Sequence, residues 1–157
     1  MVPTASRCAN ERWLRAFAYG LLAEVATVAA IVATVMAHRH LIRPGRSEAY
    51  YGGFSARAGF IVGAFGGAAF VFLFARLVMR HVNAHRISHG MTVAAGAIAL
   101  SIAGSLAGHG TVPASYLLAS ALKLVAGAVA GYASSRALVE SGYEKGAEHS
   151  AGAGVAD

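Results

Sequence analysis

Two ionisable residues, Glu24 and Lys123, stand inside long apolar runs of the sequence. A charged side chain at the centre of a bilayer costs roughly 2.5–3.5 kcal/mol on insertion scales, so such residues are usually paired or functional. In one interpretation, the acid and the base form an ion pair that fixes the register of two helices. In the other, Glu24 exchanges a proton or binds a cation, and Lys123 adjusts the charge of the site. The even match of one acid with one base favours the ion pair.

The positions of both residues along their helices are compatible with pairing. At about 1.5 Å per residue, Glu24 lies roughly 14 Å and Lys123 roughly 20 Å from the same membrane face, and the lysine stem covers much of the difference. Both share a helix face with small or hydroxyl-bearing residues: Gly20, Thr27 and Thr34 beside Glu24, and Ser115, Ala119, Gly127 and Gly131 beside Lys123. We therefore expect the first and the last apolar segment to meet with these faces inward.

Histidine is the other residue type with a suggestive spacing, since His81, His85 and His89 lie four apart. On one continuous helix, such imidazoles would line one face and suit zinc or copper. The same segment must, however, contain a turn between two apolar runs, and Arg80 and Arg86 would repel a divalent cation. We therefore favour interfacial positions for these histidines. None of the seven histidines lies deep in an apolar run, as haem ligation within a bundle requires, so we expect neither a metal nor a cofactor.

The sequence carries no motif of a catalytic site. It has no phosphate-binding glycine loop, no His-Glu-x-x-His pair and no Gly-x-Ser-x-Gly elbow. The remaining acidic residues lie in the tails or in the longest loop: Glu11, Glu48, Glu140, Glu144, Glu148 and Asp157. They do not form a paired-carboxylate site, and the sequence therefore favours a protein that is not an enzyme.

Four apolar runs organise the chain of 157 residues, of which 57% are hydrophobic and 13% charged. Soluble domains usually carry about 25% charged residues. Each run has roughly 20 residues, the length that crosses a hydrocarbon core of about 30 Å. The sequence thus predicts an all-α integral membrane bundle of four transmembrane helices, at about residues 13–37, 58–79, 91–108 and 114–135.

We expect these spans to form one membrane domain over residues 1–137. The longest loop is predicted at residues 38–57, with a segment at 47–54 lying on the membrane surface. An Ala- and Gly-rich tail follows at residues 138–157 and is predicted to be disordered.

The distribution of basic residues predicts the orientation. Eight basic residues lie in the N-terminal tail, in the connection between the second and third spans and in the C-terminal tail: Arg7, Arg12, Arg15, Arg76, Arg80, Arg86, Arg136 and Lys145. Four lie in the first loop region: Arg39, Arg43, Arg46 and Arg57. Because cytoplasmic loops carry the excess of Lys and Arg, we expect both termini in the cytoplasm of a multi-pass plasma or inner membrane protein. This explanation of the net charge of +6 leaves no reason to expect a nucleic-acid partner.

Glycines recur at intervals of four in three of the spans. They form the stripes Gly59, Gly63 and Gly67, then Gly104 and Gly108, then Gly127 and Gly131. Small residues let helix backbones approach closely in lipid, where burial of apolar side chains contributes little. We expect these stripes to pack the bundle internally, although the same faces suit a homodimer or a substrate groove.

Two functions fit these features. The first is a non-enzymatic accessory or structural membrane protein, in which Glu24 and Lys123 form an interhelical ion pair and another membrane protein, or a second copy, docks on the small-residue faces. The alternative is a small proton- or cation-coupled transporter or channel that uses Glu24 as its ion site. The sequence favours the first.

Overall fold

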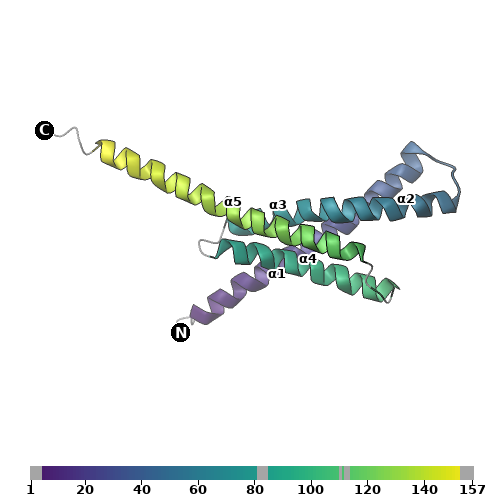
Figure 1. Ribbon diagram of the computed structural model, residues 1–157, viewed down its shortest axis with the longest axis horizontal. Helices are drawn as coiled ribbons and strands as arrows, with labels where there is room; N and C mark the ends of the chain where they lie inside the picture. Colours follow the sequence, from purple (N-terminus) through teal and green to yellow (C-terminus); the bar gives the residue numbers. More distant parts are fainter. Residues whose placement is uncertain (1–4, 81–84, 110, 112–113, 153–157) are drawn as a thin grey trace.

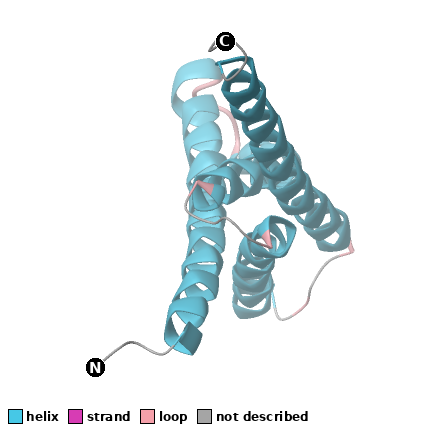
Figure 2. Cartoon of the chain, turned by 90° about the vertical axis from the view of Figure 1, so that its left-hand side faces the viewer, coloured by secondary structure: helices cyan, strands magenta, loops and turns pink. Residues whose placement is uncertain are grey.

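The computed structural model describes residues 5–80, 85–109, 111 and 114–152. Within this part of the chain every regular element is a helix and no strand occurs (Figure 2). The elements are α1 (Ala5–Ala37), η1 (His38–Ile42), α2 (Glu48–Ile61), η2 (Val62–Gly66), α3 (Gly67–Met79), α4 (Arg86–His109) and α5 (Ser115–Gly152). The π-helical segment η1 continues α1, and η2 joins α2 to α3 without a break.

Four of the resulting helices are long and apolar enough to cross a membrane: Glu11–Ile42, Glu48–Met79, Arg86–Gly108 and Ser115–Ala137. The predicted all-α fold with four such helices is therefore confirmed. The chain runs up and down, and α1 and α5 each pack against both α3 and α4 (Figure 1). α1 and α5 make little backbone contact with each other, because the other two helices separate them.

The second long helix begins earlier than the sequence pattern predicts. We expect a loop as far as residue 57, whereas the helix starts at Glu48, and the segment 47–54 forms its N-cap and first turns. Ser47 is the reason, because its extended backbone and its Oγ, which accepts from the Tyr50 amide at 3.4 Å, cap the helix. The connection shrinks to residues 43–47, where Gly45 adopts a positive φ of 78° after Pro44.

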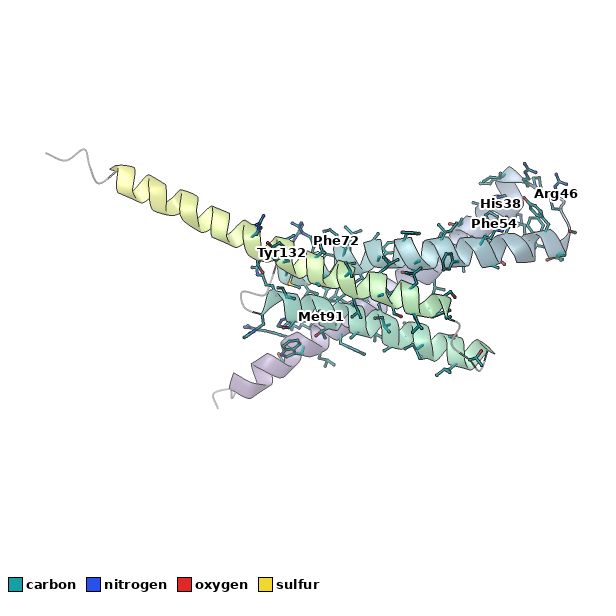
Figure 3. All side chains as sticks on the ribbon, in the orientation of Figure 1. His38, Arg46, Phe54, Phe72, Met91 and Tyr132 are labelled. Atoms are coloured by element: carbon teal, nitrogen blue, oxygen red, sulfur yellow. The ribbon has the colours of Figure 1, made fainter. Side chains whose placement is uncertain are left out.

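The tip of this α1–α2 hairpin is held together by aromatic and polar contacts (Figure 3). The His38 and Phe54 rings stack with centroids 3.7 Å apart. Tyr51 is buried, and its hydroxyl donates to the Arg43 carbonyl at 2.6 Å and accepts from the Arg46 amide at 3.1 Å. The hairpin tip is thus an ordered part of the fold.

The last helix extends past the predicted end of its span. Its backbone is helical from Ser115 to Gly152, so most of the segment that we expect to be disordered, residues 138–157, continues α5. Alanine and glutamate, which recur after Arg136, are among the strongest helix formers.

Glycine contacts divide the bundle into two ends. At the end containing the N-termini of α1 and α4, a Cβ added to Gly96 would lie 2.5 Å from the Phe17 carbonyl oxygen, and one added to Gly131 would lie 2.6 Å from the Ile87 Cα. Gly20, Gly90 and Gly127 are in similarly tight contact with neighbouring backbone. We call this half the close-packed end.

The opposite half, which holds the hairpin and the start of α5, is called the open end. A Cβ added to Gly59, Gly104 or Gly108 would meet no atom of the described structure within 4 Å, and at Gly63 it would meet only the Ile31 Cδ1, at 3.9 Å. Glycines with the same fourfold spacing therefore occupy two different environments. At one end they bring helices together, and at the other they leave space.

Candidate functional site

Glu24 on α1 and Lys123 on α5 meet between the two ends of the bundle. The Lys123 Nζ donates to the Glu24 Oε2 at 2.5 Å. Both residues are buried, with 8% and 3% of their surface exposed. The pair therefore joins the two helices that α3 and α4 otherwise keep apart.

Ser101 of α4 completes a triangle with the ion pair. Its Oγ accepts from the Lys123 Nζ at 2.7 Å and donates to the Glu24 Oε1. Each of the three side chains thus bonds to both of the others, and the three helices α1, α4 and α5 are connected. We refer to Glu24, Ser101 and Lys123 as the charge network.

A glycine on α3 makes room for the network. A Cβ at Gly67 would lie 2.8 Å from the Lys123 Cε and 3.6 Å from the Thr27 Cγ2. Thr27 is buried one turn from Glu24, but its hydroxyl donates to the Ala23 carbonyl of its own helix at 2.8 Å. The glycine therefore contributes space, and Thr27 fills the interior without joining the network.

A cavity of about 460 Å³ opens from the charge network toward the open end. Its polar wall carries the hydroxyls of Ser55, Ser115, Tyr116 and Ser120 together with the charge network itself. Its other wall is apolar or small, and includes Ile31, Phe60, Gly59 and Gly63. A second hollow of about 550 Å³, which Gly104 and Ser105 line, also reaches Glu24, Ser101 and Tyr116. The charges are thus accessible from the open end, while close helix contacts lie on their other side.

The π-helical segment η2 lies along this cavity. Gly63 and Ala64, which belong to η2, line it, and Gly67 at the segment's end contacts Lys123. A π-bulge shifts the following helical register by about one residue, and such bulges are frequent at functional sites. Here the bulge lies directly before the glycine that makes room for Lys123.

The predicted histidine group is distributed over different environments. His81 lies outside the described residues, and His85 has a positive φ of 54° directly before α4. His89 is buried, stacks on Trp13 with ring centroids 4.1 Å apart, and donates from Nδ1 to the His85 carbonyl at 3.0 Å. Over the ranges that the structure describes, no three His, Cys, Asp or Glu side chains come together in a metal-binding arrangement.

The sequence pattern does not single out Ser101, Gly90 or Gly96, and it predicts Gly20 only as a small residue on the helix face of Glu24. The signal for Ser101 is its spacing of four from Ala97 and Ser105 on one helix face. A hydroxyl on a small-residue face is a natural partner for a buried charge. Gly90 and Gly96 are less evident, because they are six residues apart and lack the fourfold spacing of the other glycines.

No known family model matches the chain, and no curated protein or solved structure is significantly similar to it. The proposed function therefore depends on the arrangement of its residues.

Proposed function

We propose that this chain is a non-enzymatic accessory or structural protein of the plasma or inner membrane, with both termini in the cytoplasm. The observation that carries the proposal is the contact of 2.5 Å between Lys123 and Glu24, supported by Ser101. A buried acid and base that neutralise each other need no ligand to balance their charge. The charge network then sets the register of α1 against α5, which have little other contact.

Two exposed glycines supply the docking face of this proposal. Gly104 and Gly108 are exposed on α4, and a Cβ added to either would meet no atom of the described residues within 4 Å. Such a face lets a helix of another membrane protein, or of a second copy, approach closely.

A double-mutant cycle on thermal stability in detergent tests the structural role of the pair. Glu24→Gln or Lys123→Met alone strands one buried charge and should lower the free energy of unfolding by about 3–5 kcal/mol. The double variant should recover most of that loss. Glu48→Gln is the matched control, since Glu48 pairs with Arg39 at the exposed hairpin tip and exposed ion pairs contribute little. Single variants as stable as the wild type would contradict the structural role.

The cavity favours a second candidate, a small proton- or cation-coupled transporter. Glu24 lies at its inner end, hydroxyls line one wall, and access is from one side of the network. In this proposal Glu24 accepts the proton or cation and Lys123 leaves the carboxylate when it does. Coupled transport requires such a group to face each side of the membrane in turn.

Flux measurements in proteoliposomes distinguish this candidate. Under a pH gradient or with monovalent cations, wild-type protein should show flux, Glu24→Gln should abolish it, and Glu48→Gln should preserve it. Each reconstituted variant is checked for helix content by circular dichroism. No flux with the folded wild-type protein under either gradient would contradict the transporter.

A further inference from the structure

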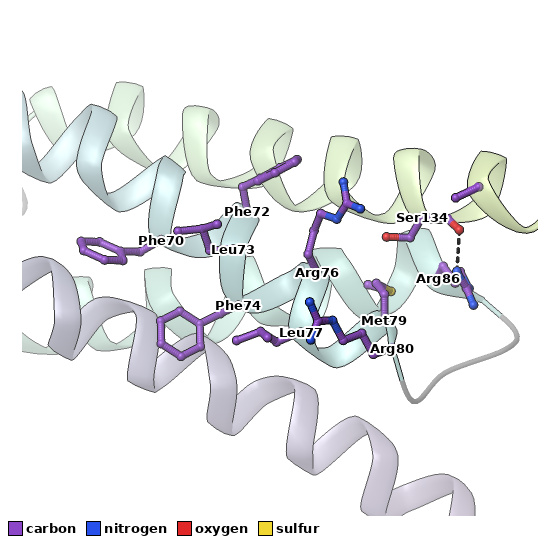
Figure 4. A pocket seen from close by; sticks show the side chains of 11 residues that line it. Phe70, Phe72, Leu73, Phe74, Arg76, Leu77, Met79, Arg80, Arg86 and Ser134 are labelled. Carbon is purple, nitrogen blue, oxygen red and sulfur yellow. Dashed lines mark hydrogen bonds between the residues drawn. The ribbon is translucent and has the colours of Figure 1, made fainter.

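A groove lies along the outer face of α3 at the close-packed end, away from the charge network (Figure 4). Its volume is about 760 Å³. Most of its wall is aromatic or aliphatic and is formed by Phe70, Phe72, Leu73, Phe74, Leu77 and Met79. Leu73 and Leu77 are 56% and 42% exposed, so this wall is open to the surroundings of the helix.

Three arginines gather at one end of the groove. Arg76 lies in the last turn of α3 and Arg80 directly follows the helix, and both are exposed. Arg86 begins α4 (Figure 4). The Arg86 Nη1 donates to the Ser134 carbonyl at 2.5 Å, which fixes its position. Its Nε is buried and has no hydrogen-bond partner among the described residues. No acidic side chain lines the groove in the described part of the chain, so this end has an excess of positive charge.

We propose that this groove binds an anionic phospholipid. The phosphate lies between Arg76, Arg80 and Arg86, because guanidinium groups match phosphate oxygens with paired N–H donors. An acyl chain lies along the apolar wall toward Phe70. Basic pockets between transmembrane helices are a recognised way of holding anionic headgroups.

The length of the groove supports a lipid over a free phosphate. Between Phe70 and Arg80, α3 rises about 15 Å. This is half of a hydrocarbon core of about 30 Å, and therefore the depth of one leaflet. A free phosphate would use the arginines alone and leave the apolar wall without a role.

Native mass spectrometry of the full chain, released from mild detergent, tests the proposal. The protein is offered equal amounts of phosphatidylglycerol and phosphatidylcholine. We expect one phosphatidylglycerol to be retained in preference. The double variant Arg76→Gln/Arg80→Gln should weaken this retention by roughly 10- to 30-fold, because each basic group near a headgroup raises the affinity by about fivefold. Arg76→Lys/Arg80→Lys keeps the charge but loses the paired guanidinium donors, so it should weaken the retention less than the Gln variant does.

The control is Arg43→Gln/Arg57→Gln, which removes the same charge from exposed positions at the open end and should leave retention unchanged. Circular dichroism shows whether each variant is folded. Equal retention of both lipids, or equal losses in the two Gln variants, would overturn the proposal. Displacement of the lipid by an equal concentration of glycerol 3-phosphate would also overturn it, since the site would then recognise phosphate alone.

Discussion

The ammonium group of Lys123 has three N–H donors, and the structure uses two of them, on Glu24 and Ser101. Each carboxylate oxygen of Glu24 accepts one hydrogen bond within the same triangle. The network therefore balances its own charge. Among the described residues, its hydrogen bonds leave one lysine donor and several carboxylate lone pairs unused. Because the cavity reaches both residues, the arrangement is compatible with a structural pair and with an ion site, and only removal of its members separates these roles.

The first prediction concerns Ser101. Ser101→Ala removes one donor and one acceptor while leaving the Glu24–Lys123 contact in place. We expect the free energy of unfolding in detergent to fall by about 1–2 kcal/mol, as for interhelical hydrogen bonds that involve charged groups. The measurement is thermal or denaturant unfolding of the purified variant.

The matched control for Ser101 is Ser120→Ala on the cavity wall, where the described structure shows no hydrogen bond from the hydroxyl. It should have little effect on stability. In the Glu24→Gln/Lys123→Met background, Ser101→Ala should lose most of its effect, because its charged partners are gone. An undiminished effect in that background would show that Ser101 acts independently of the pair.

At the scale of the helices, identical glycine spacing has two outcomes. Gly127 and Gly131 lie against the backbone of α4, whereas Gly59 and Gly63 line the cavity. The difference comes from how the helices cross: they converge at the close-packed end and separate toward the hairpin. The fourfold spacing of glycines therefore does not indicate whether a helix face packs against another helix or lines a cavity.

The second prediction compares two glycines of α4. Gly96→Ala places a methyl group 2.5 Å from the Phe17 carbonyl oxygen, which backbone movement must relieve. We expect a loss of about 1–3 kcal/mol in stability, typical of overpacking. Gly104→Ala, on the same helix and with no described atom within 4 Å of the added carbon, should leave stability unchanged or slightly raised, since alanine favours helix. Unfolding of both variants in the same detergent is the test, and equal losses would mean that helix contact at Gly96 is not the cause.

Helix number and type follow from the sequence because a bilayer core of about 30 Å requires some 20 apolar residues per span. The meeting of Glu24 with Lys123 is likewise suggested by depth and by the scarcity of buried charges. The earlier start of α2 at Glu48 depends on one capping serine, and the cavity depends on crossing angles and on the bulge at η2. These last features arise from tertiary packing, for which a single sequence has no periodic signal.

At the scale of the whole molecule, the hairpin extends beyond the rest of the bundle (Figure 1). From Glu24 to Ile42 the first helix rises about 27 Å, while α4 rises only about 12 Å from Ser101 to His109. The tip therefore lies roughly 15 Å further out. It carries His38, Tyr50 and Arg39 at its surface, residue types that suit the headgroup region. Eight basic residues belong to the segments on the side of the close-packed end and four to the hairpin, so the two ends of the molecule differ in both shape and charge.

The orientation of these two ends gives the third prediction. Cys8 is the one cysteine of the chain, and we expect it on the cytoplasmic side with the close-packed end. A membrane-impermeant maleimide should therefore leave it unlabelled in intact cells and label it in inverted membrane vesicles. In a Cys8→Ser background, Leu41→Cys, at a position that is 82% exposed in the hairpin, should show the reverse pattern. We expect this orientation because basic residues are distributed eight to four, and the more positive end is retained in the cytoplasm. Labelling of Cys8 in intact cells, together with protection of the Leu41→Cys variant, would show that the orientation is the opposite of the predicted one. The arginine groove would then lie in the outer leaflet, and the cavity above Glu24 would open toward the cytoplasm.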